Sequence, residues 1–225
     1  MFREIRSHYE ILDLLRLRHR IYFEERQYAE PKPHGLDLTP HDHLSRFYGV
    51  FRGRELVGGV RFAFRVEQET ASMMRGIRQE FQWPEEEASM GQLPSEEAFD
   101  VRIIGARASE IDVEPGRFVL TSGLSGWVGP QVLVSVLAVL LLEGARLYLY
   151  SCGTKIGQRY ARYMTPAWTL RPQGKGLGGF AFPTPTIAAI GSPNDSPYIQ
   201  LARAAADELR VFGSILLPPR LPEGL

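Results

Sequence analysis

Apolar and polar positions along the first half of the chain predict one long helix and then a pair of strands. Over residues 9–28, apolar side chains recur at helical spacing with arginines between them, which is typical of a helix with one buried face. Residues 46–51 and 56–66 have strand character, and Arg52-Gly53-Arg54 between them indicates a hairpin. A shorter helix is expected over residues 71–81.

The second half predicts alternating strands and helices. The expected elements are strands over 101–108 and 117–121, a helix over 130–143, a strand over 146–151, a helix over 154–164, a strand over 184–190 and a helix over 197–212. Gly144 is expected to end the apolar helix, and Asn194-Asp195-Ser196-Pro197 has the residues that begin one. With no internal repeat or linker, we expect a single domain over residues 1–217 and a disordered tail over 218–225.

Composition and charge exclude several classes of protein. The 225 residues carry 26 basic and 26 acidic side chains, so no overall charge attracts nucleic acid or an anionic membrane. The apolar run 132–142 is far shorter than the roughly 20 residues that span a bilayer. Cys152 is the only cysteine and the N-terminus lacks the apolar core of a signal peptide, so a cytoplasmic protein is expected.

Several charged and aromatic residues follow one another in an order that is found in a known family. They are Arg18, Tyr22, Tyr28, Asp37, Asp42, the strand segment Gly58-Gly59-Val60-Arg61, the segment Glu114-Pro115-Gly116-Arg117-Phe118, and the late helix end Tyr163-Met164-Thr165-Pro166-Ala167-Trp168. In this order the chain resembles the acyl-homoserine-lactone synthases and their N-acyl amino acid synthase relatives, over roughly residues 10 to 175.

The resemblance implies an α/β (α+β) fold of the GNAT type, with three α-β-α layers and a mixed central sheet that is splayed in the middle. It implies transfer of a fatty acyl group from an acyl-carrier protein or a coenzyme A thioester to the amine of a small acceptor, with no bound cofactor. The acceptor would be S-adenosylmethionine or an amino acid. Tyr28 stands where the family usually has tryptophan, and Pro115-Gly116 stands where it usually has Ile-Ser. These differences favour a relative of the lactone synthases that uses another amine acceptor.

Two residues are the candidates for catalysis by this resemblance. A carboxylate such as Glu114 can take the proton of an attacking amine, and Arg117 can fix that carboxylate or the carboxylate of the acceptor. The alternative is a structural ion pair that closes the turn at Pro115-Gly116.

The candidate acceptor-binding residues are Arg18, Tyr28, Asp37, Asp42 and Arg61. Buried carboxylates need paired cations, so these charges are expected to order a lid over an acceptor that has both an amine and a carboxylate. The alternative is a set of unrelated surface charges. A metal site in the His- and Asp-rich loop of residues 34–43 is not expected, because no familiar ligand spacing occurs there; His41 is a candidate auxiliary base.

The candidate donor-binding residues are Thr121, Gly123, Gly126, Lys155 and Arg159. Glycines between a strand and a helix can receive a phosphate or a pantetheine arm, and a basic helix face suits an acidic carrier protein. The alternatives are an ordinary turn and a solvated helix face. The Gln or Arg that usually begins the GNAT pyrophosphate loop is absent, which favours the carrier protein over coenzyme A. Cys152 is expected to be a core residue, not a nucleophile.

Two other functions remain open at this point. One is a non-catalytic module of the same fold that binds an acyl group or an acyl-carrier protein. The other is a GNAT enzyme that acetylates a small metabolite. Nothing in the sequence indicates an oligomeric state.

Overall fold

The computed structural model describes residues 1–225 except 29–30, 85–86, 125–127, 172–185 and 218–225. Within these residues, strands of both directions form one mixed sheet in the order β6-β7-β5-β4-β3-β2-β1-β8. The strands are β1 (Phe2–Ile5), β2 (Ser45–Arg52), β3 (Glu55–Phe64), β4 (Ile111–Leu120), β5 (Leu147–Gly153), β6 (Trp168–Leu170), β7 (Thr186–Gly191) and β8 (Ser214–Ile215).

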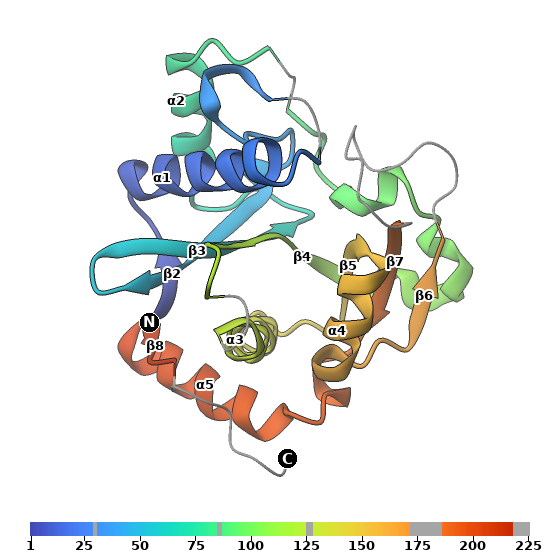
Figure 1. The fold of residues 1–225 in the computed structure, drawn as a ribbon. Coiled ribbons are helices and arrows are strands. Elements are labelled where there is room, and N and C mark those ends of the chain that lie inside the picture. The colour runs from blue at the N-terminus through green and yellow to red at the C-terminus, as the bar shows by residue number, and fades with distance from the viewer. Residues whose placement is uncertain (29–30, 85–86, 125–127, 172–185, 218–225) are drawn as a thin grey trace.

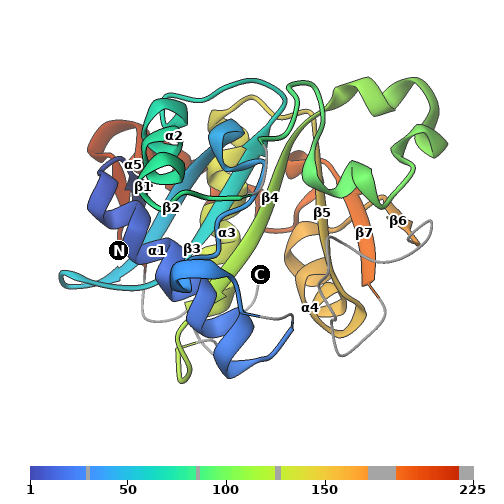
Figure 2. The same cartoon turned by 90° about the horizontal axis from the view of Figure 1, so that it is seen from above.

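Helices lie on both faces of this sheet, which gives three layers (Figures 1 and 2). Helices α1 (His8–His19) and α2 (Ala71–Glu80) lie on one face; α3 (Val128–Leu142), α4 (Thr154–Met164) and α5 (Ile199–Phe212) lie on the other. The expected α-β-α architecture is therefore confirmed. In the described part of the chain, every helix is too short or too polar to cross a lipid bilayer.

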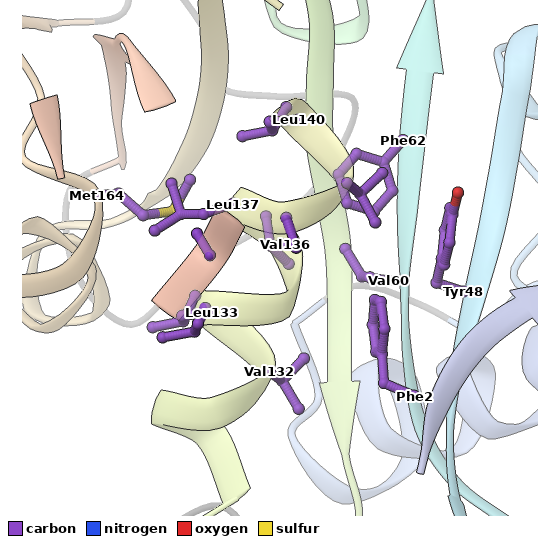
Figure 3. Packing of buried hydrophobic residues seen from close by; sticks show 14 of the residues in the cluster. Phe2, Tyr48, Val60, Phe62, Val132, Leu133, Val136, Leu137, Leu140 and Met164 are labelled. Atoms are coloured by element: carbon purple, nitrogen blue, oxygen red, sulfur yellow. The ribbon is translucent and has the colours of Figure 1, made fainter. Parts of the chain in front are cut away.

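The largest apolar cluster lies between the sheet and α3. Figure 3 shows Phe2, Tyr48, Val60 and Phe62 on three neighbouring strands, facing the side chains of the helix. Helix α3 is apolar on nearly all sides because it lies between the sheet and α5. It ends as predicted at Gly144, where φ is +67°; the amides of Gly144 and Ala145 donate to the carbonyls of Leu141 and Leu140.

The sheet is splayed between β4 and β5. These parallel strands are paired only at Ile111 with Leu147 and at Val113 with Tyr148, near their first residues, among the described pairs. Strand β4 then continues to Leu120 along β3, whereas β5 continues to Gly153 along β7. The gap that opens between them, which the resemblance predicts, is where a ligand can approach the middle of the sheet.

Two sequence predictions about the elements are wrong, and three short strands were missed. Residues 101–108 are not a strand: they lie in the 3₁₀ segment η5 (Val101–Glu110), which Gly105 interrupts at φ +67° and in which only Val101 is buried. The first helix does not continue to residue 28 as an α-helix, since π-helix η1 (Arg20–Glu25) replaces its end. The short strands β1, β6 and β8 were not predicted, because so few residues show no alternation.

The strand predicted over 117–121 is the end of β4, which begins six residues earlier at Ile111. The remaining boundaries agree with the predictions within a few residues. Helix α4 spans the predicted 154–164, and α5 begins at Ile199, two residues later than predicted. The predicted disordered tail, residues 218–225, lies outside the described residues.

A glycine at the contact between α1 and β3 gives a stability prediction. A Cβ at Gly59 would lie 2.6 Å from Leu14 Cδ1 and 2.8 Å from the backbone oxygen of Tyr48. Gly59→Ala is therefore expected to lower the free energy of unfolding by about 1–3 kcal/mol in urea titrations. The control is Gly76→Ala in α2, where the added methyl meets open space and is expected to stabilise the helix by up to about 1 kcal/mol. Equal stability of the two variants would contradict this packing.

Candidate active site

A cavity of about 720 Å³ lies at the splay between β4 and β5. Its lining on the side of α1 and β3 is polar and includes Arg26, Lys32, His41, Arg61, Glu114 and Arg117. Its lining from α3, α4 and β5 is largely apolar or aromatic and includes Leu133, Val136, Tyr150, Ile156, Tyr160 and Met164. The size and this mixture suit a small molecule with one polar and one apolar part.

Glu114 lies in the wall of this cavity and is nearly fully buried. It extends from β4 just beyond the last residue that pairs with β5. The Ser95 hydroxyl donates to Oε1 at 2.6 Å and the Ser95 backbone N–H donates to Oε2 at 2.8 Å. Burial raises the pKa of Glu114 to about 7, against the effect of the Ser95 hydrogen bonds. Near neutral pH this carboxyl group can therefore both accept and release a proton.

Arg117 is aimed at the site by a β-bulge. Gly59 pairs with Val119 and Arg61 with Gly116, so Arg117 and Phe118 together lie opposite the single residue Val60. Arg117 adopts φ +52°, which is rare for a residue with a side chain. Its Nη1 lies 3.4 Å from Asp37 in the N-terminal segment, and no ion pair with Glu114 occurs among the described contacts. The alternative of a structural ion pair between Glu114 and Arg117 is therefore wrong, and the role of Arg117 toward the acceptor stays a prediction.

Four of the predicted acceptor-binding residues form one buried ionic cluster. Arg18 Nε donates to Asp37 Oδ2 at 2.9 Å, and Arg18 Nη1 lies 3.8 Å from Asp42 Oδ1. On the other side Arg61 Nη1 lies 3.3 Å from Asp42 Oδ1. Arg18, Asp37 and Asp42 are fully buried, so the alternative of unrelated surface charges is wrong.

The electrostatics of the cluster keep its carboxylates ionised. Burial alone would raise the pKa of Asp37, but the guanidinium groups of Arg117 and Arg18 outweigh it and lower the pKa to about 2. The pKa of Asp42 is also below its usual value, because Arg18 and Arg61 outweigh its burial. The Thr39 backbone N–H donates to Asp42 at 2.8 Å and its hydroxyl accepts from Arg61 at 2.8 Å.

Aromatic rings connect this cluster to the cavity. Tyr22 and Tyr28 stack with their centroids 6.1 Å apart, and both line the cavity. The Tyr22 hydroxyl donates to the carbonyl of Phe118 at 2.8 Å, which ties η1 to the bulge. The predicted residues Tyr28 and Arg61 therefore reach the cavity, whereas Arg18, Asp37 and Asp42 lie behind its wall.

The histidine- and aspartate-rich loop shows no arrangement for a metal ion. Asp37 and Asp42 bind arginines, and His43 Nδ1 lies 3.0 Å from the carbonyl of Pro40. Among the described residues, no three His, Cys, Asp or Glu side chains come close enough to share a metal. His41 lines the cavity, and burial with the nearby Arg61 lowers its pKa to about 4, so it is neutral at pH 7.

The predicted donor-binding residues are only partly brought together. Arg159 of α4 is exposed and lines the cavity. Thr121 and Gly123 follow β4 and are not part of the lining, although Gly129 and Pro130 at the start of α3 are. Gly126 lies outside the described residues, and the Lys155 side chain is likewise not described. The donor assignment of these residues stays a prediction.

Other residues of the site were not predicted from the sequence. Ser95, Arg26, Tyr150 and Tyr160 all line the cavity, and none belongs to a recognisable motif. Cys152 is buried as expected, and burial raises the pKa of its thiol to about 12, so it is no thiolate nucleophile at neutral pH.

The fold of this chain is similar to those of an N-acyl amino acid synthase and of acyl-homoserine lactone synthases. The chain is similar to FeeM, an N-acyl amino acid synthase from uncultured soil microbes, with a TM-score of 0.59 and 16% identity over 89% of this chain and 97% of FeeM. It is also similar to MesI, a CoA-dependent acyl-homoserine lactone synthase, with a TM-score of 0.55 and 22% identity over 92% of this chain and 95% of MesI.

A third similar structure is that of BjaI, a CoA-dependent acyl-homoserine lactone synthase with SAM and isopentyl-CoA. Its TM-score is 0.55 and its identity 18%, over all of this chain and 95% of BjaI. No model of a known protein family matches the sequence, and no curated protein matches it either. These likenesses confirm the resemblance at the level of the fold.

Proposed function

We propose that the protein is an N-acyltransferase, with one catalytic domain over residues 1–217, that moves an acyl group from a thioester to the amine of a small acceptor. The observation that carries this proposal is the position of Glu114, buried in the cavity wall at the splay with its pKa raised to about 7. The backbone of β4 beyond Val113 lacks a partner strand on the β5 side among the described pairs. Its amides and carbonyls can therefore bind the amides of a pantetheine arm.

The reaction follows from the groups in the wall. The amine nitrogen of the acceptor attacks the thioester carbonyl, a C–N bond forms, the C–S bond breaks, and the sulfur leaves as a thiolate that then receives the proton lost by the nitrogen. Glu114 takes the proton that the nitrogen loses, directly or through a water molecule. The apolar lining from α3 and α4 would receive the acyl chain.

The charges of the lining favour an amino acid as the acceptor. Glu114 offers a carboxylate to the ammonium group, and Arg117 and Arg61 offer guanidinium groups to a carboxylate. Arg26 also lines this side of the cavity, so a sulfonium such as that of S-adenosylmethionine would meet a cationic wall. Of the similar proteins, FeeM is named for N-acyl amino acid synthesis.

The donor would be a thioester of coenzyme A or of an acyl-carrier protein. Arg159 and Arg162 of α4 line the cavity and are exposed, so they can bind the phosphate that both donors carry. Thioester donors of this kind suit a reducing compartment such as the cytoplasm.

A product assay tests the proposed function. The purified protein is incubated with acyl-coenzyme A and acyl-carrier-protein thioesters, pooled amino acids and S-adenosylmethionine, and the products are identified by mass spectrometry. An N-acyl amino acid is expected, with one free thiol released for each product molecule. An acyl-homoserine lactone would change the acceptor, and an acetylated metabolite would change the donor. Binding of the carrier protein without thiol release would instead support a non-catalytic module.

A further inference from the structure

The turn η4 (Pro94–Glu97) approaches β4 at Glu114. It belongs to a segment without regular periodicity, and Ser95 is its second residue. Ser95 has no exposed surface and donates to both carboxylate oxygens of Glu114, from its hydroxyl at 2.6 Å and from its backbone at 2.8 Å. One residue of this turn thus fixes the orientation of the whole carboxyl group.

The turn is itself fastened to the sheet by an arginine just after β3. Arg65 Nη1 and Nη2 donate to the two carboxylate oxygens of Glu96 at 2.9 and 2.6 Å, a bidentate pair. Arg65 Nε donates to the carbonyl of Ile111, the first residue of β4, at 2.9 Å. Glu96 in turn accepts from the backbone N–H of Leu93 at 2.9 Å, which closes the turn around Ser95.

These contacts have a direct effect on the carboxyl group of Glu114. Hydrogen bonds from Ser95 stabilise its ionised form, whereas burial stabilises its neutral form. A base must be ionised when the substrate arrives, so the Ser95 hydrogen bonds oppose the loss of activity that burial alone would cause. Side-chain geometry also matters, because a carboxylate that can rotate loses its alignment with the amine.

We propose that Ser95 is a positioning residue that keeps Glu114 ionised and oriented as the base, and that Arg65 and Glu96 hold Ser95 in place for this task. The proposal rests on the proposed function for its effect on turnover. Its effect on the ionisation of Glu114 is independent of turnover.

Ser95→Ala tests the proposal through the pH dependence of kcat/KM. Loss of the hydroxyl is expected to move the midpoint of the acid limb upward by about one pH unit, which is about a tenfold loss of activity on that limb. Activity at pH 9 is expected to recover to within a few-fold of the wild-type value. Arg65→Lys is expected to shift the midpoint in the same direction and by less. Ser109→Ala is the control, since Ser109 lies in the 3₁₀ segment η5, is exposed, is not part of the cavity lining and donates its hydroxyl to the carbonyl of Ala106.

A second measurement separates this proposal from the proposed function. The ionisation of Glu114 is followed by infrared titration, and its band is identified by its absence in Glu114→Gln. An upward shift in Ser95→Ala supports the proposal even if no substrate is turned over. An infrared midpoint that is the same in wild type and Ser95→Ala would overturn it, whatever the activity. If both variants turn over, a further loss from Ser95→Ala in the Glu114→Gln background would also overturn it, because Ser95 is proposed to act through Glu114.

Discussion

Replacing Glu114 with glutamine is expected to lower kcat/KM by about 100-fold or more, while the protein stays folded. Glutamine has the same size and can keep a hydrogen bond with Ser95, but it cannot take a proton from the attacking amine. Thiol release in the steady state measures the loss. The control is Asp112→Asn, which neutralises an exposed carboxylate on the same strand and is expected to change kcat/KM by less than about twofold. Equal activity of Glu114→Gln and wild type would show that Glu114 is not the base.

The activity of the wild-type enzyme is expected to fall as the pH is lowered, because Glu114 must be ionised to act as the base. Because burial raises the pKa of Glu114 to about 7, the ionised base is lost as the pH falls through 7. On that acid limb kcat/KM is expected to fall about tenfold for each pH unit. A midpoint near 4.5, the ordinary pKa of a glutamate, would contradict the burial of this group in the working enzyme.

Stability should change in the opposite sense from activity. The folded-state pKa of Glu114 lies above its unfolded value of 4.5, so its contribution to stability is complete below pH 4.5 and is lost as the pH rises through about 7. The loss is up to about 3 kcal/mol, since each pH unit between the two pKa values is worth about 1.4 kcal/mol. Glu114→Gln, which stays neutral, is therefore expected to unfold at higher urea concentration than wild type at pH 8.

Removal of Arg18 is expected to give the largest loss of stability. Arg18→Met leaves Asp37 and Asp42 fully buried with one cation fewer, which is expected to cost about 3–5 kcal/mol of unfolding free energy. Urea titration at pH 7 measures the cost. The matched control is Arg16→Met on the same helix, whose exposed contact with Asp13 at 3.6 Å is worth less than about 1 kcal/mol.

Two results would contradict this account of the cluster. One is an Arg18→Met variant as stable as the Arg16→Met control. The other is a stable Arg18→Met variant that keeps full activity, because the cluster holds Arg117 and the wall of the cavity in place through Asp37. A folded variant with low activity would agree with a role in ordering the acceptor site.

The sequence predicted those parts of the fold that local patterns determine. The apolar run of residues 132–142 and the glycine after it predicted a buried helix and its end, and α3 has both. The hairpin of β2 and β3 follows from two apolar strands and a tight turn. The strand predicted over residues 101–108 is wrong because their apolar side chains do not form one buried face: Val101 is buried, Ile103 is exposed, and this exposure is a tertiary property.

The site was predictable where its residues belong to a motif. Glu114, Arg117 and the Arg18 cluster were found by their order along the chain, and the structure brings the cluster together as a buried unit. Ser95 had no such signal, because it lies 19 residues from Glu114 in an irregular segment. The bulge could not be predicted from the sequence, because the positive φ at Arg117 depends on how β4 pairs with β3. Arginine is not a residue type that indicates a positive φ.

The fate of the thioester carbonyl tests the central claim most directly. An acyl thioester labelled with ¹³C at its carbonyl is mixed with the protein and an amino acid, and the label is followed by NMR. The account predicts that the thioester signal is replaced by an amide signal, only when the amine is present, and far more slowly with Glu114→Gln. A label that remains in the thioester, or that moves to a free carboxylate by hydrolysis, would contradict it.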